Sequence, residues 1–308
     1  MRIVSLLPSA TEIVCALGLR EQLVGISHRC DYPPEIEGLA VVTRPRPKAA
    51  AAGDDAPAPA PPPAAGIDDE LELSELDVAA LLAAQPDLVF VRDSGSAPSS
   101  RQVREALRAG DVEPVVVSLD AVSLEGIFHS IATVGAMAEA EDDAIELLEE
   151  LREEIADLEQ QVIVRHDAGI RAPRAVVMQD MDPTYASGLW IPEQVRRAGG
   201  WDLMGREGSP APLTSWEAIA EVDPEMLFMA PVRMRLSEAK RRWARTPKPE
   251  CWDEIAAVRK GQVFIVEPVY FNRPGPRIVE GLGMLAEIFD PEGFIETSPP
   301  ASWTPLFE

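Results

Sequence analysis

Residues 141–164 read EDDAIELLEELREEIADLEQQVIV, and this stretch decides the architecture of the chain. Its apolar residues recur at the three- and four-residue spacing of one helix face: Ile145, Leu148, Leu151, Ile155 and Leu158. Such spacing predicts a long amphipathic helix with one buried stripe. The helical pattern begins at about Leu124, and we expect a break near Ala140. Between Glu139 and Glu159 there are eleven acids and one base, which is typical of a solvated helix face.

Short apolar strands alternate with helices on both sides of this helical stretch. Strands are predicted at residues 3–7, 23–26, 87–91 and 114–117 before it, and at 175–178, 225–229 and 263–266 after it. This alternation is typical of parallel sheets covered by helices. The predicted fold class is therefore α/β, with two α/β lobes, residues 1–122 and 168–308, joined by one long linker helix, residues 123–167. Residues 45–66 include seven Pro and nine Ala, which predicts a disordered or polyproline-like insertion in the first lobe.

The charge of the chain excludes some partners. Its 308 residues carry 52 Asp and Glu against 28 Lys and Arg, a net charge of -24. Nucleic acid binding through a broad basic surface needs clustered Lys and Arg, so we expect no nucleic-acid partner, and binding to anionic lipid is not expected for the same reason. Many acids with only four lysines are typical of a salt-adapted, halophilic proteome.

Two features of the sequence bear on location. No stretch of about 20 apolar residues exists, so we expect no direct insertion into a membrane. The apolar run at the N-terminus is too short for the core of a signal peptide, which predicts a cytoplasmic location. The alternative is an extracytoplasmic, membrane-associated protein whose leader is missing from the sequence.

Motifs of the common enzyme chemistries do not occur. The sequence has no Gly-x-Ser-x-Gly elbow and no phosphate-binding Walker loop. Its three histidines are far apart, and its three cysteines form no Cys-x-x-Cys pair, so we expect no metal site, no disulfide framework and no intrinsic cofactor. The sequence therefore favours a protein that binds a ligand over an enzyme.

Candidate binding residues gather in loops after the predicted strands, where α/β sheets hold their ligands. They are Pro8, Ser9, His28, Arg29, Tyr32, Tyr185, Trp190, Val269, Tyr270, Phe271, Asn272 and Arg273. Asn272 is the only asparagine in the chain and stands beside two aromatic residues and an arginine, although a simple turn would also explain it. Flat aromatic side chains with a few fixed polar groups suit a large planar or macrocyclic ligand.

Four segments carry a resemblance to a known family. They are SLLPSATE at 5–12, GISHRCDYPP at 25–34, TYASG at 184–188 followed by IPE and GG, and YFNRPGPR at 270–277. Together they resemble the cobalamin-binding, iron-siderophore-like class of substrate-binding proteins of ABC transporters. The resemblance implies a rigid bilobed clamp, with two α/β lobes joined by a single long helix and the ligand held in the cleft.

The resemblance also implies roles for individual residues. Arg29 and the run from Val269 to Arg273 match the loops that hold the corrin, although Arg29 stands where a vitamin B12 binder has an aromatic residue. Glu217 matches a surface glutamate that docks on the permease, whereas Ala79 occupies the corresponding position of the first lobe. Residues 93–99 replace a Cys-x-x-Cys segment of many relatives. Apart from the resemblance, His28 lies in the loop after the predicted strand at 23–26, where it is either a polar turn residue or a candidate ligand of the cobalt ion.

These observations predict a monomeric, non-enzymatic binding protein for a corrinoid such as cobalamin, feeding ABC-type uptake or salvage. Arg29 and Arg273 would bond amide or phosphate oxygens of the ligand, which suits the planar arginine fork. Three alternatives stay open at this point. They are a siderophore or haem binder of the same fold, a cytosolic corrinoid-handling protein without a permease partner, and an α/β enzyme.

Overall fold

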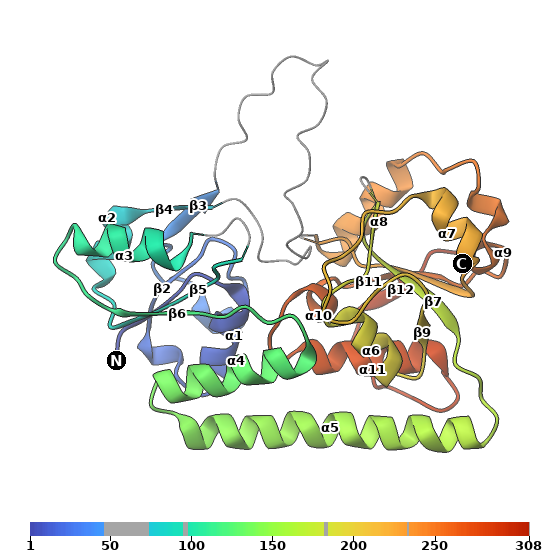
Figure 1. The fold of residues 1–308 in the computed structure, drawn as a ribbon, viewed down its shortest axis with the longest axis horizontal. Coiled ribbons are helices and arrows are strands. Elements are labelled where there is room, and N and C mark those ends of the chain that lie inside the picture. Colours follow the sequence, from blue (N-terminus) through green and yellow to red (C-terminus); the bar gives the residue numbers. More distant parts are fainter. Residues whose placement is uncertain (46–73, 95–97, 182–183, 233, 308) are drawn as a thin grey trace, which may run out of the picture. The chain divides into compact units, whose positions relative to one another are not determined.

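The computed structural model describes residues 1–45, 74–94, 98–181, 184–232 and 234–307 (Figure 1). The chain divides into two compact units. The first holds the described residues up to Ala121 together with Phe128–Leu148, and the second holds Val122–Ile127 and the described residues from Glu149 onward. Most of the predicted Pro/Ala-rich insertion, residues 46–66, lies outside the described residues, while Pro45 is the last residue of a strand.

A four-stranded parallel sheet with strand order β2-β1-β5-β6 forms the centre of the first unit. Its strands are β1 (Ile3–Ser5), β2 (Leu23–Ile26), β5 (Leu88–Val91) and β6 (Val115–Ser118). Parallel neighbours need crossover connections. Helices α1 (Pro8–Ala16), α2 (Val78–Ala84) and α3 (Ser100–Arg108) lie in these connections. An antiparallel pair, β3 (Thr43–Pro45) and β4 (Ser74–Leu76), and the short turns η1 (Arg20–Gln22) and η2 (Pro34–Ile36) complete the unit.

The second unit contains a mixed sheet. Its strand order is β12-β11-β10-β7-β8, and β9 also pairs with β7. The strands are β7 (Arg174–Met181), β8 (Thr184–Ala186), β9 (Trp201–Asp202), β10 (Met226–Met229), β11 (Val263–Val266) and β12 (Trp303–Pro305). Strands β7, β10 and β11 are parallel, as predicted, and β9, which was not predicted, also pairs in parallel with β7. Strands β8 and β12 are antiparallel to their neighbours.

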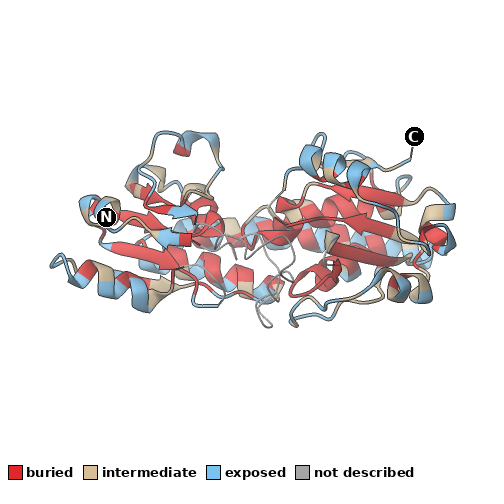
Figure 2. Ribbon diagram, turned by 90° about the horizontal axis from the view of Figure 1, so that it is seen from above, coloured by how far each residue is buried: buried red, intermediate tan, exposed pale blue. Residues whose placement is uncertain are grey.

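Helices on this sheet bury its apolar strands. They are α6 (Ile191–Arg197), α7 (Trp216–Val222), α8 (Leu236–Arg245), α9 (Ala256–Arg259), α10 (Val269–Asn272) and α11 (Ile278–Phe289), together with the turn η3 (Trp252–Glu254). Trp216, Trp243 and Trp252 pack around one another, with ring centroids 4.9 to 5.8 Å apart. They close one side of the core formed by β7, β10 and β11. Figure 2 shows the strands of both units as mostly buried.

The long helical stretch forms two helices, α4 (Leu124–Met137) and α5 (Glu141–Asp167). The expected break near Ala140 is confirmed, because Glu139 has a φ of 58° that no helix continues through. The boundary between the two units falls within α5, after Leu148. The prediction that Ile145 belongs to the buried stripe is wrong, because Ile145 is 54% exposed. Ala144 is buried instead, since it lies four residues before Leu148 on the same helix face.

Three local predictions differ from the structure. Pro8 and Ser9, which were expected in a loop, lie in the first turn of helix α1, because proline is well suited to the first helical position. Tyr185, which was also expected in a loop, lies in the strand β8. The expected loop at 269–273 is largely the short helix α10. Within the part of the chain that the structure describes, no helix is long and apolar enough to cross a bilayer.

Candidate functional site

Helix α10 follows β11 at the carboxyl edge of the second unit's sheet, and buried hydrogen bonds fix its backbone. The indole Nε1 of Trp190, which is buried, donates to the Phe271 carbonyl oxygen at 2.6 Å. The Nε2 of Gln194 donates to the carbonyl oxygens of Tyr270 at 3.1 Å and of Ile278 at 2.9 Å. The residues Trp190 and Gln194 at the start of α6 therefore hold three carbonyl groups around α10 in place.

Asn272 connects α10 to two strands of the sheet. Its side chain is fully buried. The Nδ2 atom donates to the Ala230 carbonyl oxygen, just beyond β10, at 2.8 Å. The Oδ1 atom accepts a hydrogen bond from Gln179 Nε2, on β7, at 2.7 Å. Because both ends of the amide bond to the protein, Asn272 positions the α10 segment.

The remaining residues of the run 269–273 differ in exposure. Val269, Phe271 and Arg273 are buried, whereas Tyr270 is half-buried. The guanidinium carbon of Arg277 lies 5.7 Å from the centre of the Tyr270 ring. A Cβ atom on Gly281 of α11 would stand 2.4 Å from the Tyr270 carbonyl oxygen, so only glycine permits this approach of α11 to α10. Tyr270 is thus the aromatic residue of the run that retains exposed surface.

A second polar group lies at the end of β7. Asp180 pairs in register with Tyr185 of β8, and its Oδ1 lies 3.0 Å from Nη1 of Arg242 on α8. Burial and the negative charge of Asp180 raise the pKa of the Tyr185 phenol. The phenol is therefore neutral and can donate a hydrogen bond at neutral pH.

In the first unit, the predicted residues lie after β1 and β2. Pro8 and Ser9 are buried in the first turn of α1. His28 follows β2, and its backbone nitrogen and ring Nδ1 lie 3.0 and 2.8 Å from the Thr43 hydroxyl. This contact fixes the orientation of the imidazole ring. Arg29 is half-buried and Tyr32 is 41% exposed.

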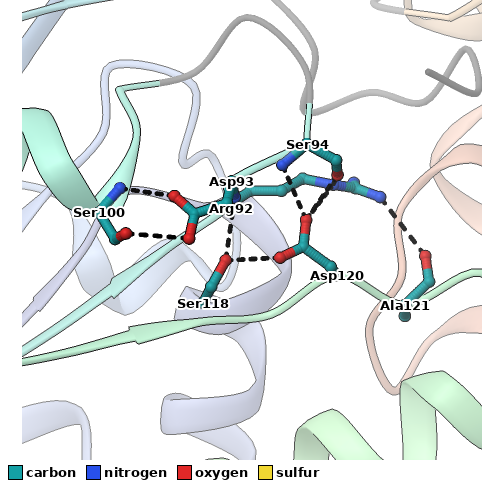
Figure 3. A network of polar contacts seen from close by, with 7 residues as sticks. All are labelled: Arg92, Asp93, Ser94, Ser100, Ser118, Asp120 and Ala121. Atoms are coloured by element: carbon teal, nitrogen blue, oxygen red, sulfur yellow. Dashed lines mark hydrogen bonds and ion pairs between the residues drawn. The ribbon is translucent and has the colours of Figure 1, made fainter. Parts of the chain in front are cut away.

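A polar network at the ends of β5 and β6 escaped the sequence analysis (Figure 3). The side chain of Arg92 is only 4% exposed, and its Nε donates to Ser94 Oγ at 2.9 Å. Ser94 Oγ and Ser118 Oγ each donate to the Asp120 carboxylate at 2.5 Å. The Asp93 carboxylate accepts a hydrogen bond from the backbone nitrogen of Ser100 at 2.7 Å.

Burial raises the pKa of Asp120, but the hydrogen bonds from Ser118 and Ser94 and the charge of Arg92 outweigh it, so the pKa lies below its ordinary value. The Asp120 carboxyl group is therefore ionised at neutral pH. The signal for it was an arginine placed directly after a fully buried strand. The segment 93–99 had been interpreted only through the cysteine pair that it lacks.

Among the described residues, no group of three or more His, Cys, Asp or Glu is arranged to hold an ion. Burial raises the pKa of the Cys15 thiol to about 11, which keeps the thiol protonated.

Glu217 is exposed in the first turn of α7. Hydrogen bonds from its own backbone and from Ser215 lower its pKa, so its carboxylate is charged. Ala79 occupies the same second helical position in α2, and it is exposed too. Both helices begin after a side-chain cap, Asp77 in α2 and Ser215 in α7. The two units thus present equivalent helix starts, and the second one carries the charge.

The chain is similar to several curated and solved proteins. It is 26% identical to the uncharacterized ABC transporter substrate-binding lipoprotein YvrC of Bacillus subtilis, covering 96% of this chain and 82% of that protein. It is 23% identical to the vitamin B12-binding protein of Vibrio cholerae, and the match covers 91% of this chain and 86% of that protein. A periplasmic heme binding protein from Pseudomonas aeruginosa has the same fold, with a TM-score of 0.70, 21% identity and coverage of 94% and 93%.

These similarities correct the predicted location. The family model is that of a periplasmic binding protein, and the relative YvrC is a lipoprotein, which points to an extracytoplasmic location. The prediction of a cytoplasmic location is therefore wrong. The short apolar run at the N-terminus, on which that prediction rested, does not decide where the protein works. The predicted two-lobed α/β fold class is confirmed by the solved relatives.

The profile of the periplasmic binding protein family matches residues 3–270. Members of this family carry a small-molecule ligand and no intrinsic cofactor, and they work with an ABC permease as partner. The prediction that the protein is not an enzyme is therefore confirmed. With this match over most of its length, the chain belongs to the periplasmic binding protein family of ABC transporters.

Proposed function

We propose that this protein binds a corrinoid such as cobalamin and delivers it to an ABC permease for uptake or salvage. The carrying observation is the α10 segment, where Tyr270 offers an aromatic surface on a backbone held by Trp190, Gln194 and Asn272. A flat macrocycle gains most from a rigid aromatic surface, because little side-chain or loop entropy is lost on binding. Similarity to a vitamin B12-binding protein over 91% of the chain supports the same ligand class.

The proposal assigns further roles in each unit. In the second unit, Tyr185 supplies a neutral phenol beside Asp180, and Arg273 supplies a guanidinium group next to α10. In the first unit, Arg29 and Tyr32 follow β2, and Arg29 would bond amide or phosphate oxygens of the corrinoid. His28, with its Nδ1 at the Thr43 hydroxyl, is assigned as a cobalt ligand through the other ring nitrogen.

The charged Glu217 is assigned to permease docking. Its exposed carboxylate at the start of α7 suits an arginine of a partner protein. The first unit has Ala79 at the equivalent position, so the proposal gives the second unit the charged docking contact. A Glu217→Gln variant should bind the ligand normally and lose affinity for the permease.

Calorimetric titration of the purified protein with cyanocobalamin tests the main proposal. We expect a dissociation constant below about 10 μM. Tyr270→Ala should weaken binding about tenfold, because it removes an aromatic contact at the centre of the site. Trp201→Ala is the matched control, since Trp201 is 65% exposed and pairs with the first residue of β7, at the opposite edge of the sheet.

Parallel titrations with haemin and a ferric hydroxamate decide between ligand classes. Tight binding of either one, with no cyanocobalamin binding below about 10 μM, would overturn the corrinoid assignment. The absorption spectrum of the bound corrinoid tests His28 separately, because loss of a cobalt-bound imidazole in His28→Ala shifts the visible bands. An unshifted spectrum removes His28 from the proposed ligand set.

A further inference from the structure

Helix α8 concentrates positive charge in an otherwise acidic chain. Residues 234–250 read MRLSEAKRRWARTPKPE and contain six Lys or Arg against two Glu, whereas the whole chain has a net charge of -24. Ala239 and Trp243 anchor one face of α8 in the core of the second unit. The four basic residues within α8, Lys240, Arg241, Arg242 and Arg245, therefore occupy the faces that the core leaves open.

A groove of about 650 Å³ lies beside α8, with Met234 and Pro247 among its lining residues. Arg241, Arg242 and Arg245 line it, together with Glu238. These four residues are spaced i, i+3, i+4 and i+7, so they share one helix face. The volume is within the range of small-molecule sites, roughly 300–1,000 Å³. The groove is shallow and open to solvent, which suits a small anion held by exposed guanidinium groups.

The neighbouring charges are already engaged within the protein. Lys248 Nζ donates to the Trp243 carbonyl oxygen at 2.8 Å and lies 3.8 Å from the centre of that indole ring. Lys240 Nζ lies 3.4 Å from Thr304 Oγ1. The Glu238 carboxylate accepts a hydrogen bond from the backbone nitrogen of Arg235 at 3.0 Å, at the start of α8. The groove's one carboxylate is thus committed to capping its own helix.

The arginines of the groove divide into two kinds. Arg242 is oriented by its ion pair with Asp180 at 3.0 Å. Arg241 and Arg245 are exposed and make no ion pair with any residue that the structure describes. Their guanidinium groups are four residues apart on a helix, an arrangement in which like charges repel. The helix dipole favours a cation in the last turn, which accounts for Arg245, but it does not require a second guanidinium beside it.

We propose that this groove binds a small anion with clustered acidic oxygens, such as a tricarboxylate or a pyrophosphate group. Arg241 and Arg245 hold the anion through paired N–H···O bonds, the geometry that arginine forms with carboxylate and phosphate. Binding removes the repulsion between the two guanidinium groups. No residue of α10 lines the groove, although Arg242 also pairs with Asp180, beside the Tyr185 assigned to the corrinoid. The anion proposal rests on Arg241 and Arg245, so it does not depend on the corrinoid proposal.

Calorimetry of the full-length protein with citrate and with pyrophosphate, at low and matched ionic strength, tests the proposal. The double variant Arg241→Gln/Arg245→Gln should raise the dissociation constant at least about tenfold, since each charged hydrogen bond contributes strongly. Arg101→Gln/Arg206→Gln is the control, because both arginines are exposed on other segments and the change in net charge is the same. The probe with the higher affinity identifies the site as a carboxylate or a phosphate site.

Two results would overturn the proposal. One is the absence of saturable binding of either probe to the unaltered protein at low ionic strength. The other is an equal loss of affinity in both double variants, which would show an effect of net charge alone. Thermal unfolding of each variant confirms that it is folded, so a loss of binding in the groove variant cannot arise from unfolding.

Discussion

Replacing Asn272 with Asp converts a buried amide into a buried carboxyl group of the same shape. In the unaltered protein, Asn272 donates to the Ala230 carbonyl oxygen at 2.8 Å and accepts from Gln179 at 2.7 Å. The new carboxyl group, when protonated, can make both bonds, because it has one O–H donor and one carbonyl acceptor. When ionised, it has no donor and places negative charge against the Ala230 oxygen. The variant should therefore lose stability only where the new carboxyl group ionises.

The size of the loss follows from burial. The side chain at position 272 is fully buried, and burial can raise the pKa of a carboxyl group by up to about 3–5. If the pKa rises by about 3, and each pH unit corresponds to about 1.36 kcal/mol, Asn272→Asp should lower the free energy of unfolding by about 4 kcal/mol at pH 7. The folded-state pKa lies above the unfolded one, which is about 3.9, so the loss is absent below about pH 4 and grows as pH rises to the folded-state value.

Urea denaturation followed by tryptophan fluorescence measures this loss. All six tryptophans lie in the second unit, so the signal reports on the unit that contains Asn272. Asn272→Ala is the control. It leaves two buried partners unsatisfied, costing about 1–3 kcal/mol each, and adds no titrating group, so its difference from the unaltered protein should not change with pH. A loss for Asn272→Asp that is below about 1 kcal/mol at pH 7, or constant from pH 4 to 7, would refute the reasoning.

Four further predictions follow from other contacts. Gly281→Ala and Gly283→Ala each place a Cβ atom within 2.6 Å of a backbone oxygen, and each should cost about 1–3 kcal/mol in urea denaturation, but only Gly281→Ala should also weaken cyanocobalamin binding in calorimetry. Asp120→Asn should make the amide hydrogens of residues 93 and 94 exchange faster at pH 7. The pKa of the Asp120 carboxyl group is lower in the folded protein than in the unfolded chain. Its contribution to stability is therefore complete above the unfolded-state pKa and is lost as pH falls through the folded-state pKa. Leu151→Ala should lower the free energy of unfolding by about 2–4 kcal/mol, whereas Ile145→Ala, on the exposed face, should change it by less than about 0.5 kcal/mol. Added salt should raise the thermal stability of this protein of net charge -24 by screening its self-repulsion, with little change in cyanocobalamin affinity.

The strands and helices were predictable because their patterns are local. The run at 263–266 is predicted and observed as a strand with the same bounds, and the break near Ala140 is where the helix ends. The stripe on α5 failed at Ile145 because two adjacent positions fit the same spacing, and only packing decides which one is buried. The patterns of hydrophobicity thus determine the elements better than the exact faces they bury.

The candidate site was less predictable because its contacts join distant residues. Asn272 was singled out as unusual, but its partners Gln179 and Ala230 are 93 and 42 residues away in sequence. No local pattern identifies them, so the amide could not be assigned to positioning in advance. The network of Arg92 and Asp120 depends in the same way on the adjacency of β5 and β6, which appears only in the folded sheet.

The pairing of β3 with β4 has a consequence for how the sequence can vary. Pro45 and Ser74 are register partners, so the two ends of the connection between these strands lie at neighbouring points of the first unit. Closing a long connection there in place of a short turn costs only about 1–2 kcal/mol of chain entropy, since this cost grows with the logarithm of length. This junction can therefore accept deletions, expansions or an inserted reporter domain while the parallel sheet behind it keeps its register.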